Sequence, residues 1–473
     1  MFASLAPRWV CALALGVAMS GCAGARDSGP SDRASASAAR TAPAPENPAP
    51  LGSLELDAPL TDLEPLRAWV GGARVVALGE REHGDADAFR VRARMVRYLH
   101  EELGFDTLAF ESGLYDCRLG NDLLRAGAPG SAVARACAFS IWAYAVEMQP
   151  LFEYLAAEAK RGRPLELVGF DTQFSGRLAP CAAEDLVADL SVGGVTLEPA
   201  ALETLDLTLA ALRDDTARRT PTERTRGRAL LQELLAKLDG AAPDDAPEER
   251  LAFTRQWLKS LLALDDDYYA YQESGGVVSA EQDNTRDRAM ADNLLYWAKR
   301  PREGQPRKVI VWAASAHLAR SVERLGLIDH GDHQHDYRVL MPMGEYLSSA
   351  LGGELRSLAV ITGAGESGRI GGERQALPER PAESWEAWFE GRRAQHLLEG
   401  PPLPQFISLL DPTYRGVSRR ADVLGIRDFP LADWSLMFDA LLYVPKMHAV
   451  TDVDGEKAAL RLKKHQAGAR CER

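Results

Sequence analysis

The chain has 473 residues, of which 46% are hydrophobic and 26% are charged, and its formal net charge is -13. This composition is that of a globular protein, and the length suits one large domain that carries an insertion. The acidic balance argues against a nucleic-acid partner, because phosphate binding needs a basic face.

The N-terminus is predicted to be an export signal. Arg8 is followed by a short apolar stretch that ends at Met19 and is too short to span a bilayer. The small residues before Cys22 resemble a bacterial lipobox, so residues 1–22 are predicted to be a lipoprotein-type signal peptide. Lipidation at Cys22 would make the protein an exported, membrane-anchored lipoprotein of the cell envelope. An ordinary signal peptide, cleaved at the nearby Ala-Gly-Ala, is the alternative.

Four cysteines follow the predicted anchor: Cys117, Cys137, Cys181 and Cys471. An exported compartment permits disulfides, and four thiols allow three sets of pairs. Cys117 with Cys137 is the first expected pair, because the two are close in sequence. Buried free thiols remain the alternative, and no cysteine has the spacing of a metal ligand.

Four apolar runs predict buried strands, at residues 75–78, 107–110, 165–170 and 308–313. Stretches with helical spacing separate the first three, so right-handed crossovers and a parallel sheet are expected. The fold class is therefore predicted to be α/β, with a central, mostly parallel sheet flanked by helices. "LRSLAVITG", "FISLL" and "MFDALLYVP" are further candidate strands.

The composition divides the chain into regions. Residues 23–50 are rich in Ala, Ser and Pro and are expected to form a flexible tether. The α/β domain is expected over residues 51–460, followed by a tail at 461–473. Long amphipathic stretches at residues 182–300 predict a helical insertion between the third and fourth strands.

Ionisable residues follow each of the four predicted strands: Glu80 and His83, Glu111, Asp171, and His317. In open parallel sheets, ligands bind outside the carboxyl ends of the strands. A single carboxylate after a strand is more often a helix cap or a salt-bridge partner, so the convergence of several carries the prediction.

Glu80 and His83 are predicted to form a general base. Gly79 permits a sharp turn, and an i, i+3 spacing places both side chains on one helical face. A carboxylate beside an imidazole orients the ring and raises its basicity near neutral pH. The alternative is that Glu80 caps the helix and His83 fills a polar gap. The chain has no Gly-x-Ser-x-Gly motif, which argues against a serine nucleophile of the α/β-hydrolase type.

Arginines on two predicted helices are candidate oxyanion partners: Arg90 and Arg92 after His83, and Arg286 and Arg288 in "NTRDRAMADNLLYW". A guanidinium aimed at a developing oxyanion would lower the barrier by about 3 kcal/mol. For any one of these arginines, a solvated surface salt bridge is the alternative.

The stretch "DHGDHQHDY" contains His330, His333 and His335 at spacings that can bind zinc. It is polar and has no apolar shell, so a solvated loop is expected instead.

Several segments, in this order, resemble the erythromycin esterase family: "ALGEREHG", "FRVRARMVRYLHEELGFDTLAFE", "VGFD", "RDRAMADNLLYW", "VIVWAASAH", "MPMGEYL" and "FDALLYV". The resemblance implies hydrolysis of the lactone ester of macrolide antibiotics, without a metal or other cofactor. It implies that His83 is the base, with Glu80 beside it, and that Glu111, His317 and the helix arginines line the pocket. The chain departs from the family pattern Trp-Ala-His-Asn-x-His at Ala314, which replaces the first histidine.

The predicted function is hydrolysis of a carboxylic ester or lactone, a small molecule, by base-activated water. His83, oriented by Glu80, would take the proton from water, and Arg288 or its neighbours, helped by His317, would stabilise the oxyanion. The residues expected to contact substrate are Arg90, Arg92, Arg286 and Asp171.

Two rival hypotheses remain open. One is a metal-dependent hydrolase that uses Glu80, His83, Glu111 or Asp171, and His317 as ligands. The other is a non-catalytic envelope lipoprotein that binds a small apolar molecule. The sequence gives no indication of the oligomeric state.

Overall fold

The computed structural model describes residues 48–214, 217–240, 247–273, 280–329, 334–395, 403–453 and 471. The predicted signal peptide with Cys22, most of the predicted tether and the predicted tail apart from Cys471 lie outside these residues. The end of the predicted tether is corrected, because β1 (Ala49–Pro50) pairs with a strand of the domain.

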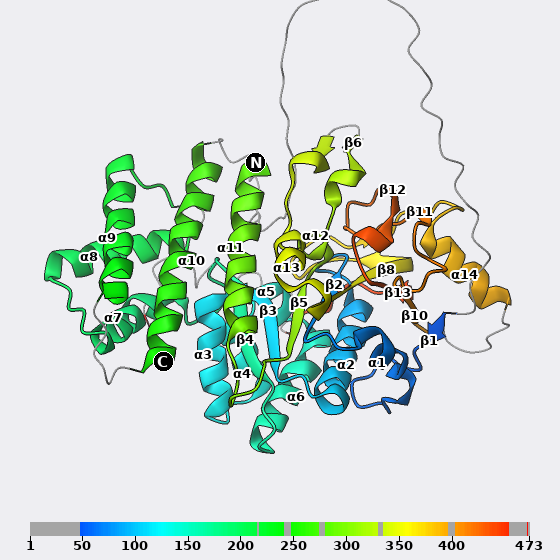
Figure 1. The fold of residues 1–473 in the computed structure, drawn as a ribbon, viewed down its shortest axis with the longest axis horizontal. Helices are drawn as coiled ribbons and strands as arrows, with labels where there is room; N and C mark the ends of the chain where they lie inside the picture. The colour runs from blue at the N-terminus through cyan, green and yellow to red at the C-terminus, as the bar shows by residue number, and fades with distance from the viewer. Residues whose placement is uncertain are drawn as a thin grey trace, which may run out of the picture.

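One twisted sheet organises the domain (Figure 1), with the strand order β1-β10-β13-β8-β2-β5-β3-β4. At its centre β2 (Val75–Glu80) lies between β5 (Val309–Ala314) and β8 (Leu355–Ser367). On the other side of β5 follow β3 (Thr107–Gly113) and the edge strand β4 (Glu166–Asp171). These five strands are parallel, so their carboxyl ends share one rim.

The opposite half of the sheet mixes directions. The strand β13 (Ala440–Met447) is parallel to β8, β10 (Gln405–Ser408) is antiparallel to β13, and β1 is antiparallel to β10. The short β9 (Gln375–Ala376) pairs with the far end of β8. The predicted α/β class, with a mostly parallel sheet, is confirmed.

The strands bury both of their faces, since alternate residues point to opposite sides. Val76 and Leu78 belong to one apolar core, and Val75 and Ala77 belong to the other. The first core is covered mainly by α1 (Pro65–Val70), α2 (Ala86–Leu103), α4 (Gly130–Cys137), α5 (Ser140–Ala143) and α6 (Gln149–Lys160). The second includes residues of α3 (Leu114–Arg125), α13 (Met343–Leu351) and α14 (Trp385–Gln395).

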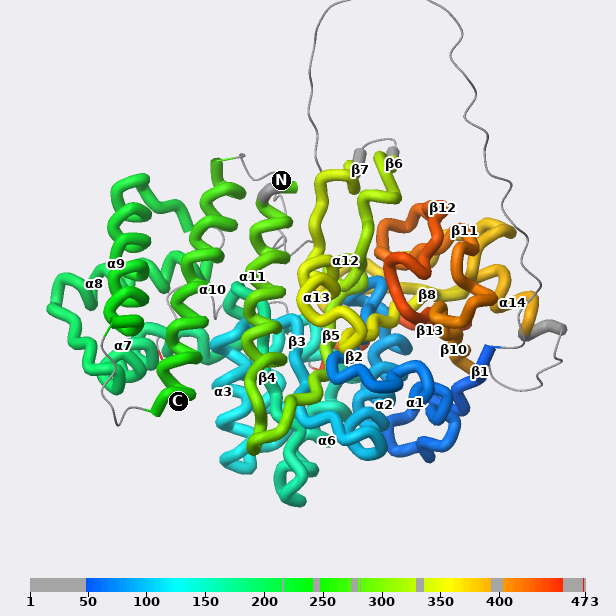
Figure 2. Tube along the Cα trace, viewed as in Figure 1, coloured from blue at the N-terminus to red at the C-terminus, as the bar shows by residue number. Residues whose placement is uncertain are grey.

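Between β4 and β5 the described residues form α7 (Ala182–Val192), α8 (Pro199–Leu212), α9 (Pro221–Gly240), α10 (Glu248–Glu273) and α11 (Ala280–Lys299). Figure 2 shows α7 to α10 beyond the β4 edge, with α11 next to the sheet. The strand β4 would otherwise present unpaired carbonyl groups. Trp297 Nε1 donates to the Gly169 oxygen at 3.0 Å and Asn293 Nδ2 to the Phe170 oxygen at 2.9 Å, so α11 supplies donors to two carbonyls of this strand.

The remaining α-helix and strands are short. They are α12 (Ser315–Leu318) and two hairpins, β6 (Leu327–Asp329) with β7 (Gln334–Asp336) and β11 (Ser418–Arg420) with β12 (Leu431–Asp433). The expected loop at the histidine-rich stretch is corrected in part, because His335 lies in β7, whereas His330 and His333 lie outside the described residues. None of the described helices is long and apolar enough to cross a membrane.

Two disulfides join cysteines of the described residues. Cys117 on α3 is bonded to Cys137 at the end of α4, which confirms the first expected pair, and Cys181 is bonded to Cys471. The alternative of free thiols at these four positions is therefore wrong.

Removal of the first disulfide should destabilise the fold. Cys117→Ala combined with Cys137→Ala opens a loop of 20 residues and should lower the free energy of unfolding by about 3 kcal/mol, since the unfolded chain gains conformational freedom. Urea unfolding of the oxidised wild type and the double variant measures this change. An unchanged midpoint would contradict the stabilising role of this bond.

Candidate active site

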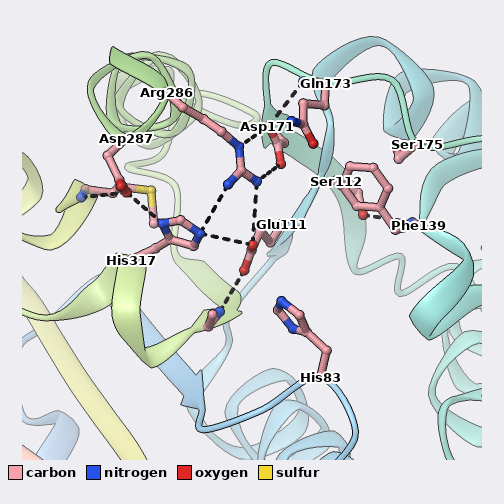
Figure 3. A network of polar contacts seen from close by, with 12 residues as sticks. His83, Glu111, Ser112, Phe139, Asp171, Gln173, Ser175, Arg286, Asp287 and His317 are labelled. Carbon is pink, nitrogen blue, oxygen red and sulfur yellow. Dashed lines mark hydrogen bonds and ion pairs between the residues drawn. The ribbon is translucent and has the colours of Figure 1, made fainter. Parts of the chain in front are cut away.

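The carboxyl ends of β2, β3 and β4 and the helix after β5 bring their ionisable residues to one rim. Figure 3 shows His83, Glu111, Asp171 and His317 gathered there, together with Arg286 from α11. The sequence predicted that these residues converge, and the sheet register explains why: adjacent parallel strands end at neighbouring positions.

Glu80 anchors one side of the cluster. It is fully buried, and its Oε1 accepts from His83 Nδ1 at 2.5 Å, while Arg92 donates to its Oε2. The Arg92 guanidinium in turn lies 3.7 Å from the centre of the Trp312 ring. Burial favours the neutral form of Glu80, but the charge of Arg92 and the His83 hydrogen bond outweigh it and hold the pKa of Glu80 below its usual value. The ring of His83 also packs edge-on against Trp142, with 5.1 Å between centroids.

Glu111 occupies the centre of the cluster, at the end of β3. Its Oε2 accepts from the backbone N–H of Ala314 at 2.7 Å, so the position that departs from the family pattern still contributes a backbone donor. Its Oε1 lies 3.4 Å from His317 Nε2 and 3.8 Å from Arg286 Nη2. In Figure 3 the imidazole of His83 lies on the other side of Glu111 from Arg286.

The N-terminal half of α11 supplies the third part of the cluster. Arg286 binds both oxygens of Asp171, with Nε to Oδ1 at 3.3 Å and Nη2 to Oδ2 at 2.5 Å. The next residue, Asp287, accepts from His317 Nδ1 at 2.8 Å and from the backbone N–H of Met343 at 3.0 Å. One helical turn therefore orients both an arginine and a histidine.

A cavity of about 130 Å³ adjoins this cluster on the side of Arg286, Asp287 and His317. Asp267 of α10 is a further buried acidic residue of its lining. The rest of the wall is largely apolar and includes Val322, Tyr337, Leu340, Met341, Pro342, Leu424 and Ile426. This arrangement places ionisable groups at one side of an apolar space, which is the usual form of a small-molecule site.

Arg288 does not reach the cluster. Its side chain is 60% exposed, lies 3.4 Å from Asp292 and is stacked over the ring of Tyr346. Residues two positions apart on a helix point about 200° away from each other, so only one of Arg286 and Arg288 can face the rim. The arginine of α11 that the structure brings to the site is Arg286, which corrects the expectation for Arg288.

Arg90 does not reach the cluster either, because it points away from Arg92 on the same helix. It is 40% exposed and lies 3.8 Å from Glu55, whereas Arg92 on the same helix is buried against Glu80. Arg92 therefore holds Glu80 in position, and Arg90 lies outside the cluster.

The sequence analysis did not identify Asp287 or Asp267. Asp287 could have been found, because an acidic residue next to Arg286 at the start of a helix leading to the His317 strand is a natural partner for that histidine. Asp267 has no such local signal, since it reaches the cavity only because α10 packs against α11.

Within the described residues, no three His, Cys, Asp or Glu side chains are grouped so that they could hold a metal ion. Glu80 and Asp171 each face an arginine instead.

One protein family and several known proteins are similar to this chain. The family described as erythromycin esterase matches residues 100–440. The chain belongs to the erythromycin esterase family. It is 24% identical over 329 residues to the erythromycin esterase type II of Escherichia coli, covering 65% of this chain and 74% of that protein.

Two further proteins are similar to the chain. A Bacillus subtilis (strain 168) protein, YbfO, whose description as a hydrolase is provisional, is 38% identical over 112 residues, which are 24% of this chain but only 25% of that protein. The structure also resembles that of a mutant of the erythromycin esterase EreC in its open conformation, with a TM-score of 0.63 at 16% identity, covering 85% of this chain and 98% of that one.

The buried Asp267 should make the stability of this esterase-family domain depend on pH. Burial raises its pKa to about 6, although Arg286 and a hydrogen bond from Gln282 oppose the shift. Between the ordinary pKa of 3.8 and about 6 the folded protein binds more protons than the unfolded chain, so the free energy of unfolding should fall by about 3 kcal/mol as the pH rises through this window.

Asp267→Asn should remove that part of the pH dependence. Urea unfolding of both proteins at a series of pH values from about 4 to about 7 measures it. A variant that retains the full wild-type slope would show that another group is responsible.

Proposed function

We propose that the protein hydrolyses a carboxylic ester or lactone with water that His83 activates. The observation that carries the proposal is the buried chain from Arg92 through Glu80 to His83. With Glu80 ionised, His83 Nδ1 donates to the carboxylate, so Nε2 is the nitrogen that can accept a proton from water. A general base of this kind contributes about 10²- to 10⁴-fold to the rate.

Arg286 and His317 are proposed to act on the substrate carbonyl, where the oxyanion forms after attack by hydroxide. Arg286 binds both oxygens of Asp171, so its guanidinium is oriented before substrate arrives and needs little reorganisation to stabilise an oxyanion. His317 is oriented by Asp287 through Nδ1, and its Nε2 lies 3.4 Å from Arg286 Nη1, so it holds that guanidinium in place. The proton that His83 takes from water then passes to the departing alkoxide.

The substrate is proposed to place an apolar portion in the cavity next to Arg286 and His317. Cavities that enclose drug-sized ligands measure roughly 300–1,000 Å³, whereas this one measures about 130 Å³. A macrolide lactone, which the family suggests, would therefore extend well outside it, while a small ester or lactone would fit inside. Both classes belong in a substrate screen.

We also propose that the protein is exported and anchored through a lipid on Cys22. The two disulfides support export, because such bonds persist in oxidising compartments. Substrate would then be met at the membrane surface of the cell envelope.

His83→Ala should lower hydrolysis by at least about 10²-fold, because the proposed mechanism gives the proton of water to this ring. The screen should contain p-nitrophenyl acetate, small lactones and macrolides, with the mass gain of one water as the readout. The control is His100→Ala, since His100 lies at the far end of α2 against Tyr154 and should leave turnover unchanged.

Full turnover by His83→Ala would exclude it as the base. Binding of screen compounds by the wild type, without any turnover, would favour the rival hypothesis of a non-catalytic binding lipoprotein.

Two arginines of the same helix test the oxyanion proposal. Arg286→Gln should lower kcat by about 10²- to 10³-fold, whereas Arg288→Gln should stay within about 2-fold of the wild type, because its side chain faces solvent. Melting temperatures of both variants separate lost chemistry from lost folding. Equal effects of the two substitutions on kcat would contradict the assignment of Arg286.

A further inference from the structure

The loop that carries His83 is enclosed by the C-terminal third of the chain. It joins β2 to α2 at residues 81–85, and the His83 side chain faces back toward Glu80 and Trp142. The flanking residues of the loop contact segments that lie far later in the sequence.

Arg81 makes the strongest of these contacts. Its side chain is completely buried. Its Nε and Nη2 bind the two oxygens of Asp85 at 3.1 and 2.9 Å, and its Nη1 binds Asp422 Oδ2 at 3.0 Å. The guanidinium thus closes the loop on itself and fastens it to the segment before β12.

The backbone of the loop is equally confined. The Gly84 oxygen accepts from the Gly368 N–H at 3.1 Å, and a Cβ on Gly84 would lie 2.6 Å from the Gly368 carbonyl carbon. A Cβ on Gly425, whose φ is +71°, would lie 2.3 Å from the Arg81 oxygen. The glycines at these two contacts therefore allow the C-terminal segments to close directly onto the loop.

The position of the loop depends on Arg81 because its positive charge lies between two buried carboxylates. One guanidinium compensates two buried carboxylates, and burial raises the pKa of both Asp85 and Asp422 while the charge of Arg81 opposes that shift. Without the guanidinium, two buried negative charges would face each other with no cation between them. Such a pair must take up protons, admit water or move apart, and each of these changes displaces the loop.

We propose that Arg81 is a positioning residue for the general base: through Asp85 and Asp422 it clamps the loop so that His83 Nδ1 stays on Glu80. The inference rests on the proposed function of His83 as the base. A displacement of about 1 Å in a reacting group can cost about 10²-fold in rate, so a clamp distant from substrate can control kcat.

The test compares Arg81→Met with Arg94→Met. Arg94 is an equally buried arginine on α2 that binds both oxygens of Asp62 and the backbone oxygens of Ser53 and Pro59, away from the rim, so its loss reports the cost of removing a buried guanidinium outside the site. At a temperature where both variants are folded, Arg81→Met should lower kcat by about 10²-fold with little change in KM, and Arg94→Met should leave kcat near that of the wild type.

Histidine NMR supplies a readout that does not depend on turnover. In Arg81→Met the ring-proton signals of His83 should shift, because the imidazole moves relative to Glu80 and to the Trp142 ring against which it packs, whereas Arg94→Met should leave them in place. Arg81→Lys restores the charge without the two-pronged contact and should recover part of kcat.

Should Arg81→Met fail to fold, Asp422→Ala decides, since it removes one contact of the clamp and leaves the pair with Asp85. It should lower kcat by about 10-fold and move the same ring-proton signals, because the loop loses its link to the C-terminal segment. An unchanged kcat and unchanged His83 ring-proton signals in the folded variants would overturn the clamp while leaving the hydrolase proposal intact. Hydrolysis by His83→Ala would instead overturn the base, and the ring-proton signals would still decide whether Arg81 positions the ring.

Discussion

A carboxylate with no access to water is stable as an anion only when cationic or donor groups surround it. Glu80, at the end of the central strand, is in that position. Arg92 supplies the charge, and the imidazole of His83 supplies the hydrogen bond. The need to compensate the charge of Glu80 therefore fixes the orientation of the His83 ring. Trp312, which packs against Arg92, and Trp142, which packs against His83, are apolar surfaces that keep water away from the carboxylate.

The sheet topology brings the second half of the site to the first. Because β2, β5, β3 and β4 run in the same direction, groups from four distant parts of the chain meet at one rim. The helical insertion completes that rim, since α11 both donates hydrogen bonds to two carbonyls of β4 and contributes Arg286 and Asp287. Helix α11 therefore both borders the edge of the sheet and supplies side chains to the candidate active site.

Much of this could be predicted from the sequence, because the relevant signals are local. Apolar runs mark strands, and the ionisable residues that follow them, such as Glu80, Glu111 and Asp171, must lie at the rim of a parallel sheet. The choice between Arg286 and Arg288 could not be made locally, because it depends on the rotation of α11 against β4. The contact between Arg81 and Asp422 could not be predicted either, because the two residues are 341 positions apart and no periodic pattern in the sequence links them.

The disulfide between Cys181 and Cys471 has a consequence for how the protein withstands proteolysis. It joins the start of the helical insertion to the extreme C-terminus, with a sequence separation of 290. A single peptide bond cut by a protease anywhere between these two cysteines would leave both fragments covalently joined. The strands and helices on either side of the cut could then remain assembled, so a nicked molecule would keep its rim together until the bond is reduced.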